Sequence, residues 1–245
     1  MDSHLSSLPL YAQVEASIAA DIASGALPVE GQLPPEDRLI AKYGVSRTTL
    51  RKAIENLVAR RLVEIRRGSG TFVTRPQLRQ ELTELTGFAE DMIALGKSPS
   101  SKLLDKKVVE ADEVVAERLR LLKGTSVYRI TRLRVADGIA MSFDETYLPL
   151  DIGGKVVEND LDAEPIFALL EGKYDVPLLR ADYELEATVA SEPIASALGI
   201  APGSPVFLID RTTYSDADRP VDYERLYYRG DLIRFATRLQ RRKPA

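Results

Sequence analysis

The fold of the first part of the chain is decided by residues 43–58, which read YGVSRTTLRKAIENLV. Ser46 is a good N-cap, and Val45 and Leu50 occupy the two positions of a hydrophobic staple, so we predict that a helix begins directly after Ser46. The apolar residues recur at helical spacing and form one stripe: Leu50, Ala53, Ile54, Leu57 and Val58. The polar and basic residues of the first two turns are left on or near the opposite face.

Two further helices are predicted upstream. Residues 10–24 carry apolar residues on one face, and Gly25 suits a C-cap. Pro34-Pro35 mark the start of a second helix, which Gly44 can end in the left-handed conformation. Two short helices joined through Gly44 and Val45 match a helix-turn-helix, whose second helix enters the major groove of DNA.

A β-hairpin is predicted directly after these helices. Residues 62–73 read LVEIRRGSGTFV, in which two apolar runs flank Gly68-Ser69-Gly70. Arg66 and Arg67 stand beside the tip, where they are placed to reach a phosphate backbone or the minor groove. Three helices and a basic hairpin together predict a winged helix-turn-helix.

The charge distribution agrees with this interpretation. The net charge of the 245 residues is −4, which on average argues against nucleic acid. Residues 42–75, however, contain nine basic and two acidic residues, whereas residues 76–245 have a net charge of −6. Such an asymmetry is expected when one module meets a polyanion and the other does not.

The first 75 residues resemble the DNA-binding domain of the GntR family. The resemblance covers about residues 8–74 and rests on residues 31–36 (GQLPPE), 43–53 and 68–73. It implies that Arg47 and Arg51 reach bases or nearby phosphates, and that the polar residues beside them position the helix. The surface assigned to DNA consists of Ser46, Arg47, Thr48, Thr49, Arg51, Lys52, Arg66, Arg67, Gly68 and Gly70.

Two residues depart from the family pattern. Pro35 stands where the family usually has Ser or Ala, and Asp37 stands where it often has Arg. Asp37 would repel phosphate, so a backbone contact is not expected from that position; Arg38 or Lys42 could substitute for it.

The rest of the chain is predicted to be a mixed α+β domain with an antiparallel sheet. Strands are expected at 126–136 and 139–147, joined by the turn signal Asp137-Gly138, and at 178–190, 206–214 and 220–228. Short helices fit at 111–120, 164–172 and 192–198. We place the DNA-binding domain at 1–75, a linker at 76–80 and the second domain at 81–245.

The second domain resembles the UTRA effector-binding domain of the HutC subfamily, whose fold is similar to that of chorismate lyase. The resemblance spans roughly residues 80–242 and rests on the order and spacing of motifs at 85–92, 96–99, 132–138, 147–149 and 228–231. It implies a regulator whose affinity for DNA responds to a small molecule.

An anion clamp is predicted on the strand that carries Arg132 and Arg134, because two residues at this spacing share one face and guanidinium groups suit phosphate or carboxylate. An internal ion pair or a solvated strand end is the alternative. A two-residue turn at Asp137-Gly138 would bring Glu145 to that face, and a three-residue loop would bring Asp144; the resemblance favours Asp144. It also assigns Asp222 to the effector site, and Phe88 and Tyr228 could form its walls or simply pack in the core.

Composition narrows the possible functions. Cysteine is absent and the one histidine is His4, so disulfides, thiolate metal sites and most His-driven catalysis have almost nothing to build on. No membrane span, metal or cofactor is expected, and we predict a cytoplasmic location. The leading interpretation is a homodimeric repressor, which a phosphorylated or carboxylated metabolite releases from a palindromic operator. The alternatives are an enzyme that uses the lyase-like domain and a constitutive DNA-binding protein without an effector.

Overall fold

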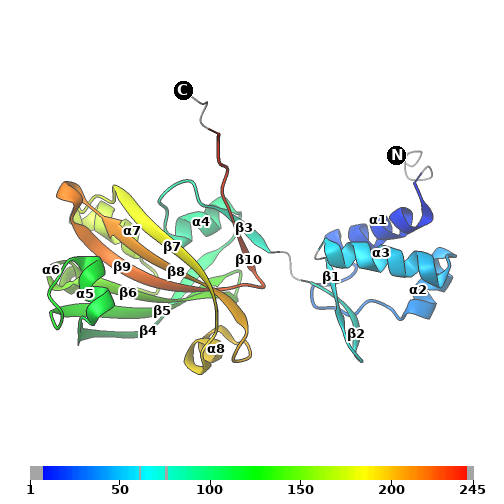
Figure 1. Ribbon diagram of the computed structural model, residues 1–245, viewed down its shortest axis with the longest axis horizontal. Coiled ribbons are helices and arrows are strands. Elements are labelled where there is room, and N and C mark those ends of the chain that lie inside the picture. Colours follow the sequence, from blue (N-terminus) through cyan, green and yellow to red (C-terminus); the bar gives the residue numbers. More distant parts are fainter. Residues whose placement is uncertain (1–7, 61, 75–76, 242–245) are drawn as a thin grey trace. The chain divides into compact units, whose positions relative to one another are not determined.

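In the computed structural model the chain forms two compact units, which divide between residues 76 and 77 (Figure 1). The structure describes residues 8–60, 62–74 and 77–241. Each unit has its own hydrophobic core, and each is described separately below.

The first unit is a winged helix-turn-helix. It contains α1 (Leu10–Ala23), α2 (Glu36–Tyr43) and α3 (Arg47–Ala59), followed by the hairpin of β1 (Val63–Arg66) and β2 (Gly70–Val73). Gly44 ends α2 with φ at +61°, which confirms the left-handed C-cap. The three predicted helices and the predicted hairpin are all confirmed.

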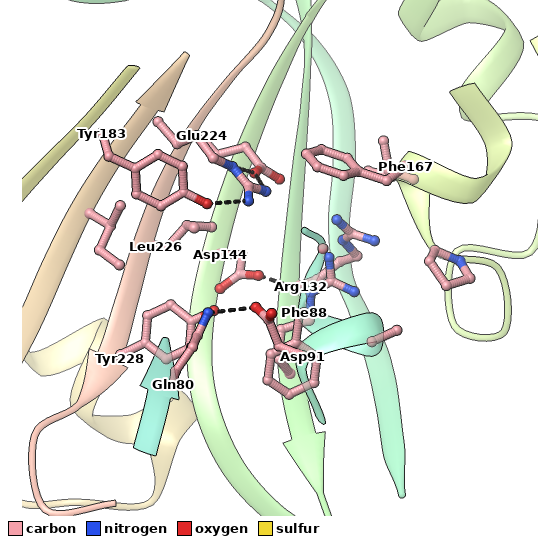
Figure 2. A pocket seen from close by; sticks show the side chains of 17 residues that line it. Gln80, Phe88, Asp91, Arg132, Asp144, Phe167, Tyr183, Glu224, Leu226 and Tyr228 are labelled. Carbon is pink, nitrogen blue, oxygen red and sulfur yellow. Dashed lines mark hydrogen bonds and ion pairs between the residues drawn. The ribbon is translucent and has the colours of Figure 1, made fainter. Parts of the chain in front are cut away.

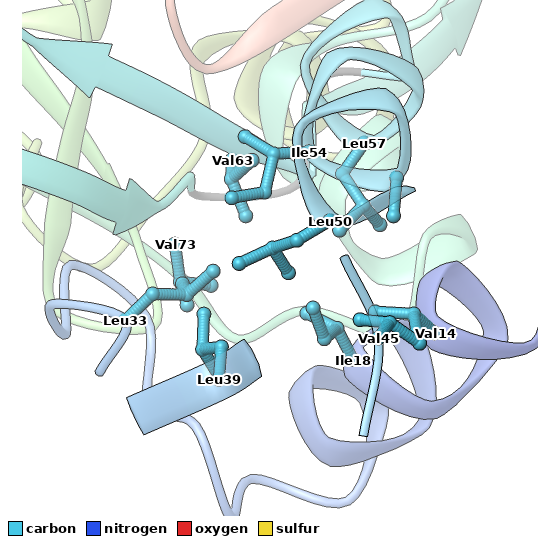
Figure 3. Packing of buried hydrophobic residues seen from close by; sticks show 11 residues of the cluster. Val14, Ile18, Leu33, Leu39, Val45, Leu50, Ile54, Leu57, Val63 and Val73 are labelled. Carbon is cyan, nitrogen blue, oxygen red and sulfur yellow. The ribbon is translucent and has the colours of Figure 1, made fainter. Parts of the chain in front are cut away.

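A single cluster of aliphatic side chains holds the first unit together (Figure 3). The predicted stripe on α3 supplies Leu50, Ala53, Ile54 and Leu57, all of them buried. The two hairpin strands add Val63 and Val73, which lie opposite each other in the ladder. Burial of this stripe fixes which face of α3 points outward.

The second unit is built on a six-stranded antiparallel sheet with the order β4-β5-β6-β9-β8-β7. The strands are β4 (Pro99–Glu110), β5 (Ser126–Ala136), β6 (Ile139–Pro149), β7 (Arg180–Val189), β8 (Pro205–Tyr214) and β9 (Pro220–Arg229). The predicted strands are confirmed, with bounds that differ by at most two residues, but β4 was not predicted. Its charged residues hide the alternation of a half-buried strand.

Helices cover both faces of this sheet. α5 (Glu113–Leu119) and α8 (Glu192–Leu198) pack on the face that carries Tyr223 and Tyr227. The opposite face meets α4 (Phe88–Ala94), α6 (Leu150–Val156), α7 (Ile166–Ala168) and the π-helix η1 (Leu169–Lys173). The helix predicted over 164–172 is therefore divided between α7 and η1. A 3-10 turn, η2 (Asp216–Asp218), joins β8 to β9.

The linker prediction was too long. β3 (Leu78–Glu81) pairs in parallel with β10 (Ile233–Ala236), so residues 78–80 belong to the second unit, and residue 76 lies outside the described residues. This short sheet could not be predicted from the sequence, because its two strands are more than 150 positions apart and neither has a strong local signal.

Candidate functional sites

The start of α3 is fixed by local contacts. The Ser46 hydroxyl accepts a hydrogen bond from the Thr49 backbone N–H at 3.2 Å, and Ser46 Oγ lies 2.8 Å from Thr49 Oγ1. Val45 and Leu50 are buried, as a hydrophobic staple requires. The cap and the staple together set the direction in which the first turns of α3 leave the core.

The three cations of α3 that are predicted to meet DNA all lie on the exposed side of the helix. The side chains of Arg47, Arg51 and Lys52 are 60%, 61% and 56% exposed. Each is held by a carboxylate: Arg47 by Asp37 at 2.8 Å, Arg51 by Glu36 at 3.5 Å and Lys52 by Glu55 at 3.9 Å. Exposed pairs of this kind contribute about 1 kcal/mol or less, so a polyanion can displace them.

The hairpin tip is held in a defined shape. Gly68 and Gly70 have φ values of +76° and +121°, and the Gln32 side-chain amide donates to the Ser69 carbonyl at 2.7 Å. Arg66 lies over the Phe72 ring, 4.4 Å from its centroid, and pairs with Glu64, while Arg67 is exposed. The predicted wing is present with both arginines at its surface.

Replacement of Gly70 by alanine is expected to distort the wing. A Cβ at this position would run into the Gln32 amide, and φ of +121° lies outside the range that alanine adopts. We expect the first unit to lose about 1–3 kcal/mol of unfolding free energy, and DNA affinity to fall, as measured by chemical denaturation and gel shift.

Gly68→Ala is the matched control for this change. Gly68 also has a positive φ, but a Cβ there meets open space, so its cost should be limited to about 1–2 kcal/mol. Equal losses in the two variants would contradict the role given to the Gln32 contact.

In the second unit, the pairing of β5 with β6 decides which acid faces the arginines. The turn at Asp137-Gly138 has two residues, both with positive φ, as a tight hairpin requires. A bulge between Arg134 and Val135 then shifts the register by one, so that Arg132 lies opposite Asp144. Glu145 is on the other face, 3.9 Å from Arg129.

This face of the sheet and the segments that cover it enclose a small pocket (Figure 2). Phe88, Arg132, Arg134, Asp144 and Tyr228, all predicted from the sequence, line it. The other lining residues are Gln80, Gly87, Ala89, Asp91, Pro165, Ile166, Phe167, Tyr183, Ile209, Arg211, Glu224 and Leu226. The cavity volume is about 20 Å³, room for about one water molecule, so entry of a metabolite requires the lining residues to move apart.

Two of the three arginines in the pocket are neutralised. Arg134 Nε donates to Asp144 Oδ2 at 2.9 Å, and Ser142 donates to the other oxygen of Asp144 at 2.7 Å. Arg211 Nε donates to Glu224 Oε2 at 2.8 Å, and Thr146 donates to Glu224 Oε1 at 2.9 Å. Both pairs are buried and well satisfied, which such pairs need in order to be stable.

Arg132 is the exception. Its side chain is fully buried, and none of its three guanidinium nitrogens has a hydrogen-bond partner among the described residues. Burial, together with the charge of Arg134, lowers its pKa to about 9, so it remains cationic at neutral pH. The pocket therefore contains a positive charge that no neighbouring carboxylate holds by a hydrogen bond.

Aromatic rings flank these charges. The Arg134 guanidinium lies 5.7 Å from the centroid of Phe88, and that of Arg211 lies 4.6 Å from the centroid of Phe167. Tyr228 is buried and stands edge-on to Phe235 at 5.4 Å. A cationic centre between aromatic walls is suited to an anionic organic molecule.

Comparison with known proteins gives the family. Residues 10–73 match the gntR family of bacterial regulatory proteins, and residues 94–234 match the UTRA domain. The chain belongs to the GntR family. Its UTRA domain agrees with the predicted HutC subfamily, and it is a DNA-binding transcriptional regulator rather than an enzyme.

Relatives of this GntR regulator match along nearly the whole chain. The HTH-type transcriptional repressor NagR of Bacillus subtilis is 34% identical over 236 residues, 96% of this chain and 97% of the relative. The repressor MngR of the mannosyl-D-glycerate transport/metabolism system of Escherichia coli is 27% identical and covers 96% of this chain and 97% of its own. The crystal structure of PhnF from Mycobacterium smegmatis superposes with a TM-score of 0.68 at 26% identity, covering 94% of this chain and 100% of that one.

Asp222, which was assigned to the effector site from the sequence, does not line the pocket of this GntR regulator. It is fully buried on β9, on the same face as Glu224. Its carboxylate lies opposite Thr213 of β8, and neither oxygen makes a hydrogen bond of good geometry in the described part of the chain. Burial and the charge of Glu224 raise its pKa to about 7. Glu224, two residues further along β9, is the acid that reaches the pocket.

Several pocket residues of the GntR regulator were missed from the sequence, chiefly Arg211, Glu224, Tyr183 and Gln80. Arg211 and Glu224 stand opposite each other on β8 and β9, so their pairing depends on the cross-strand register. Gln80 lies on β3, donates to Asp91, and has a buried side-chain oxygen without a partner in the described part of the chain. A sequence signal for Glu224 was available, because residues at alternate positions of a strand share one face. Glu224 lies on the same face of β9 as Asp222 and Tyr228, which were both assigned to the effector site.

Across the described residues, no group of three or more His, Asp or Glu side chains is placed to hold a metal ion. Within the same residues, every helix is too short or too polar to cross a membrane.

Proposed function

We propose that this GntR regulator is a homodimeric repressor that a small anionic metabolite releases from its operator. The observation that carries the proposal is Arg132, a fully buried guanidinium that lines the pocket and has no hydrogen-bond partner among the described residues. An unpaired buried charge is costly, and an anionic ligand removes that cost.

The proposed effector carries a phosphate or carboxylate that binds Arg132. Arg134 and Arg211 already have hydrogen-bonded partners in Asp144 and Glu224, so one anionic group is sufficient to pair the remaining guanidinium. The names of two relatives, the mannosyl-D-glycerate system repressor and the probable repressor of the fructoselysine utilization operon, support a sugar-derived compound.

For DNA, we propose that α3 enters the major groove and the wing contacts the backbone or the minor groove. The residues assigned to these contacts are Ser46, Arg47, Thr48, Thr49, Arg51, Lys52, Arg66, Arg67, Gly68 and Gly70. A homodimer would place two such helices in successive major grooves, with half-sites about 10 base pairs apart. Because the chromosome is its partner, the protein would act in the cytoplasm.

Release follows from linkage between the two sites. An effector that binds one dimer arrangement better than the DNA-bound arrangement lowers DNA affinity by the ratio of its two affinities. β3 offers a route for this coupling: Gln80 lines the pocket, and the strand begins two positions after the boundary between the units.

Arg47→Ala and Arg51→Ala test the DNA surface. On an operator obtained by in vitro selection with the unmodified protein, each change is expected to weaken binding about 10- to 100-fold, the value of about 1–3 kcal/mol for a good base contact. Gel-shift titration measures it. Arg79→Ala, which removes an exposed, ion-paired arginine of the second unit, should leave the affinity unchanged. Full affinity in both α3 variants would overturn the assignment.

A thermal-shift screen tests the effector site. Phosphorylated sugars, phosphonates and small carboxylates that bind should raise the melting temperature by mass action, and the same compounds should release the operator. A screen in which none of these compounds raises the melting temperature would favour a constitutive DNA-binding protein without an effector.

A further inference from the structure

Asp37 is an unexpected residue beside the DNA-binding surface. It is the second residue of α2, its side chain is 83% exposed, and it holds Arg47, the first residue of α3, by a hydrogen-bonded ion pair of 2.8 Å. Arg47 itself is 60% exposed. A carboxylate is thus attached directly to the first cation of the helix that is proposed to enter DNA.

Helix stability accounts for only a small part of the role of this acid. The helix dipole favours a carboxylate in the first turn by about 0.3–1 kcal/mol, and both Glu36 and Asp37 lie there. An exposed ion pair adds little to folding. The consequence of Asp37 should therefore be sought in binding.

The pair affects two kinds of DNA contact differently. The hydrogen bond to Asp37 uses one Arg47 nitrogen, Nη2, and a guanidinium has five N–H donors. Donors that remain free can read a base edge while Asp37 holds the side chain in place. A phosphate, in contrast, must compete with the carboxylate for the same positive charge and approach a negative one.

We propose that Asp37 is a specificity-determining residue, which restrains Arg47 and suppresses its binding to DNA of arbitrary sequence. This inference rests on the proposed function of α3 as the DNA-reading helix. It predicts that the protein distinguishes its operator from other DNA partly because its affinity for other DNA is lowered. Non-specific binding depends on phosphate contacts, and these are the contacts that Asp37 opposes.

Asp37→Asn tests the inference, since it removes the charge and keeps the shape. On a scrambled 30-base-pair duplex, we expect affinity to rise about 3- to 10-fold and the slope of log K against log salt to become steeper by about one. Affinity for the selected operator should rise less, so the specificity ratio should fall.

Asp151→Asn is the matched control for net charge. Asp151 is likewise the second residue of a helix that follows a proline cap, is exposed, and pairs with Arg219 at 2.6 Å, but it lies in the second unit. It adds the same charge to the protein without freeing Arg47. An increase in non-specific affinity that is equal in Asp37→Asn and Asp151→Asn would overturn the proposal.

A second comparison tests whether Asp37→Asn acts through Arg47 or only through the charge of the DNA-binding surface. In the Arg47→Ala background, Asp37→Asn should no longer change the salt slope, because the freed cation is absent; a persisting change would also overturn the proposal. If the unmodified protein binds neither DNA at low salt, the proposed function fails and not this inference alone.

Discussion

Replacing Arg132 by methionine is expected to stabilise the second unit and to abolish its response to effector. The side chain is fully buried, and its guanidinium has no hydrogen-bond partner in the described residues, so the attraction of Glu224 and Asp144 repays its desolvation only in part. Apolar replacement of a whole buried ion pair is neutral or stabilises a protein by about 1–4 kcal/mol, and we expect a gain in this range for a buried cation without a hydrogen-bonded partner. In a unit of this size each kcal/mol corresponds to roughly 2–4 °C.

The measurement is a melting curve together with an operator titration with and without the effector. Arg132→Met should melt higher and should bind the operator normally, but no anion should release it. Arg134→Met is the control: Arg134 is bonded to Asp144, so its removal leaves a buried carboxylate and should lower stability. A loss of stability in both variants would show that Arg132 is paired in the folded protein.

The second large effect is expected on β9. Replacing a carboxyl by an amide should lower the free energy of unfolding at Glu224 and raise it at Asp222. Burial opposes ionisation of Glu224, but Arg211, Arg132 and Arg134 outweigh it and lower the pKa of this carboxyl. Glu224→Gln leaves the Arg211 guanidinium buried without its counter-charge, so unfolding free energy should fall by about 3–5 kcal/mol. Denaturant titration of the intact chain measures the loss.

Asp222→Asn should stabilise the protein at alkaline pH. The pKa of Asp222 is raised to about 7, above the ordinary value of 3.8 that the unfolded chain has. Between about pH 4 and pH 7 the unfolded state therefore binds fewer protons than the native state, and unfolding free energy falls as pH rises. The loss levels off about one pH unit above the native pKa, where the carboxyl is ionised in both states.

The asparagine variant removes this dependence. Its advantage over the unmodified protein should be small near pH 4 and on the order of 2–4 kcal/mol at pH 8. Denaturation at the two pH values measures the difference. Equal stabilities at pH 8 would mean that the Asp222 carboxylate is compensated in the native state.

Much of the DNA-binding unit could be predicted from the sequence because its signals are local. The Ser46 cap, the Val45–Leu50 staple and the Gly44 C-cap act over a few positions, and each has the predicted geometry. The hairpin turns at Gly68–Gly70 and Asp137-Gly138 are local as well. They depend on backbone conformations that the residues themselves favour.

The contents of the pocket depended on contacts between distant strands. The two-residue turn alone would have placed Glu145 beside Arg132, and the bulge next to Arg134 reverses that outcome in favour of Asp144. The pairing of Arg211 with Glu224 follows from the register of β8 on β9, and Gln80 reaches the pocket through a strand that pairs with β10. A slip of one residue exchanges the two faces of a strand, and no local pattern determines it.

The sequence by itself therefore determined two modules, the surface of α3 and its wing, and the arginine-bearing strand. Only the tertiary structure decided which of the three arginines has no hydrogen-bond partner among the residues that the structure describes. Arg132 and Arg134 are equivalent in spacing and chemistry. They differ because strand register and the surrounding side chains give Arg134 a hydrogen-bonded carboxylate, whereas within the described residues Arg132 has no hydrogen-bond partner. Charge compensation in a buried site is a property of three-dimensional neighbours, and these are assembled here from segments that span more than 140 positions of the chain.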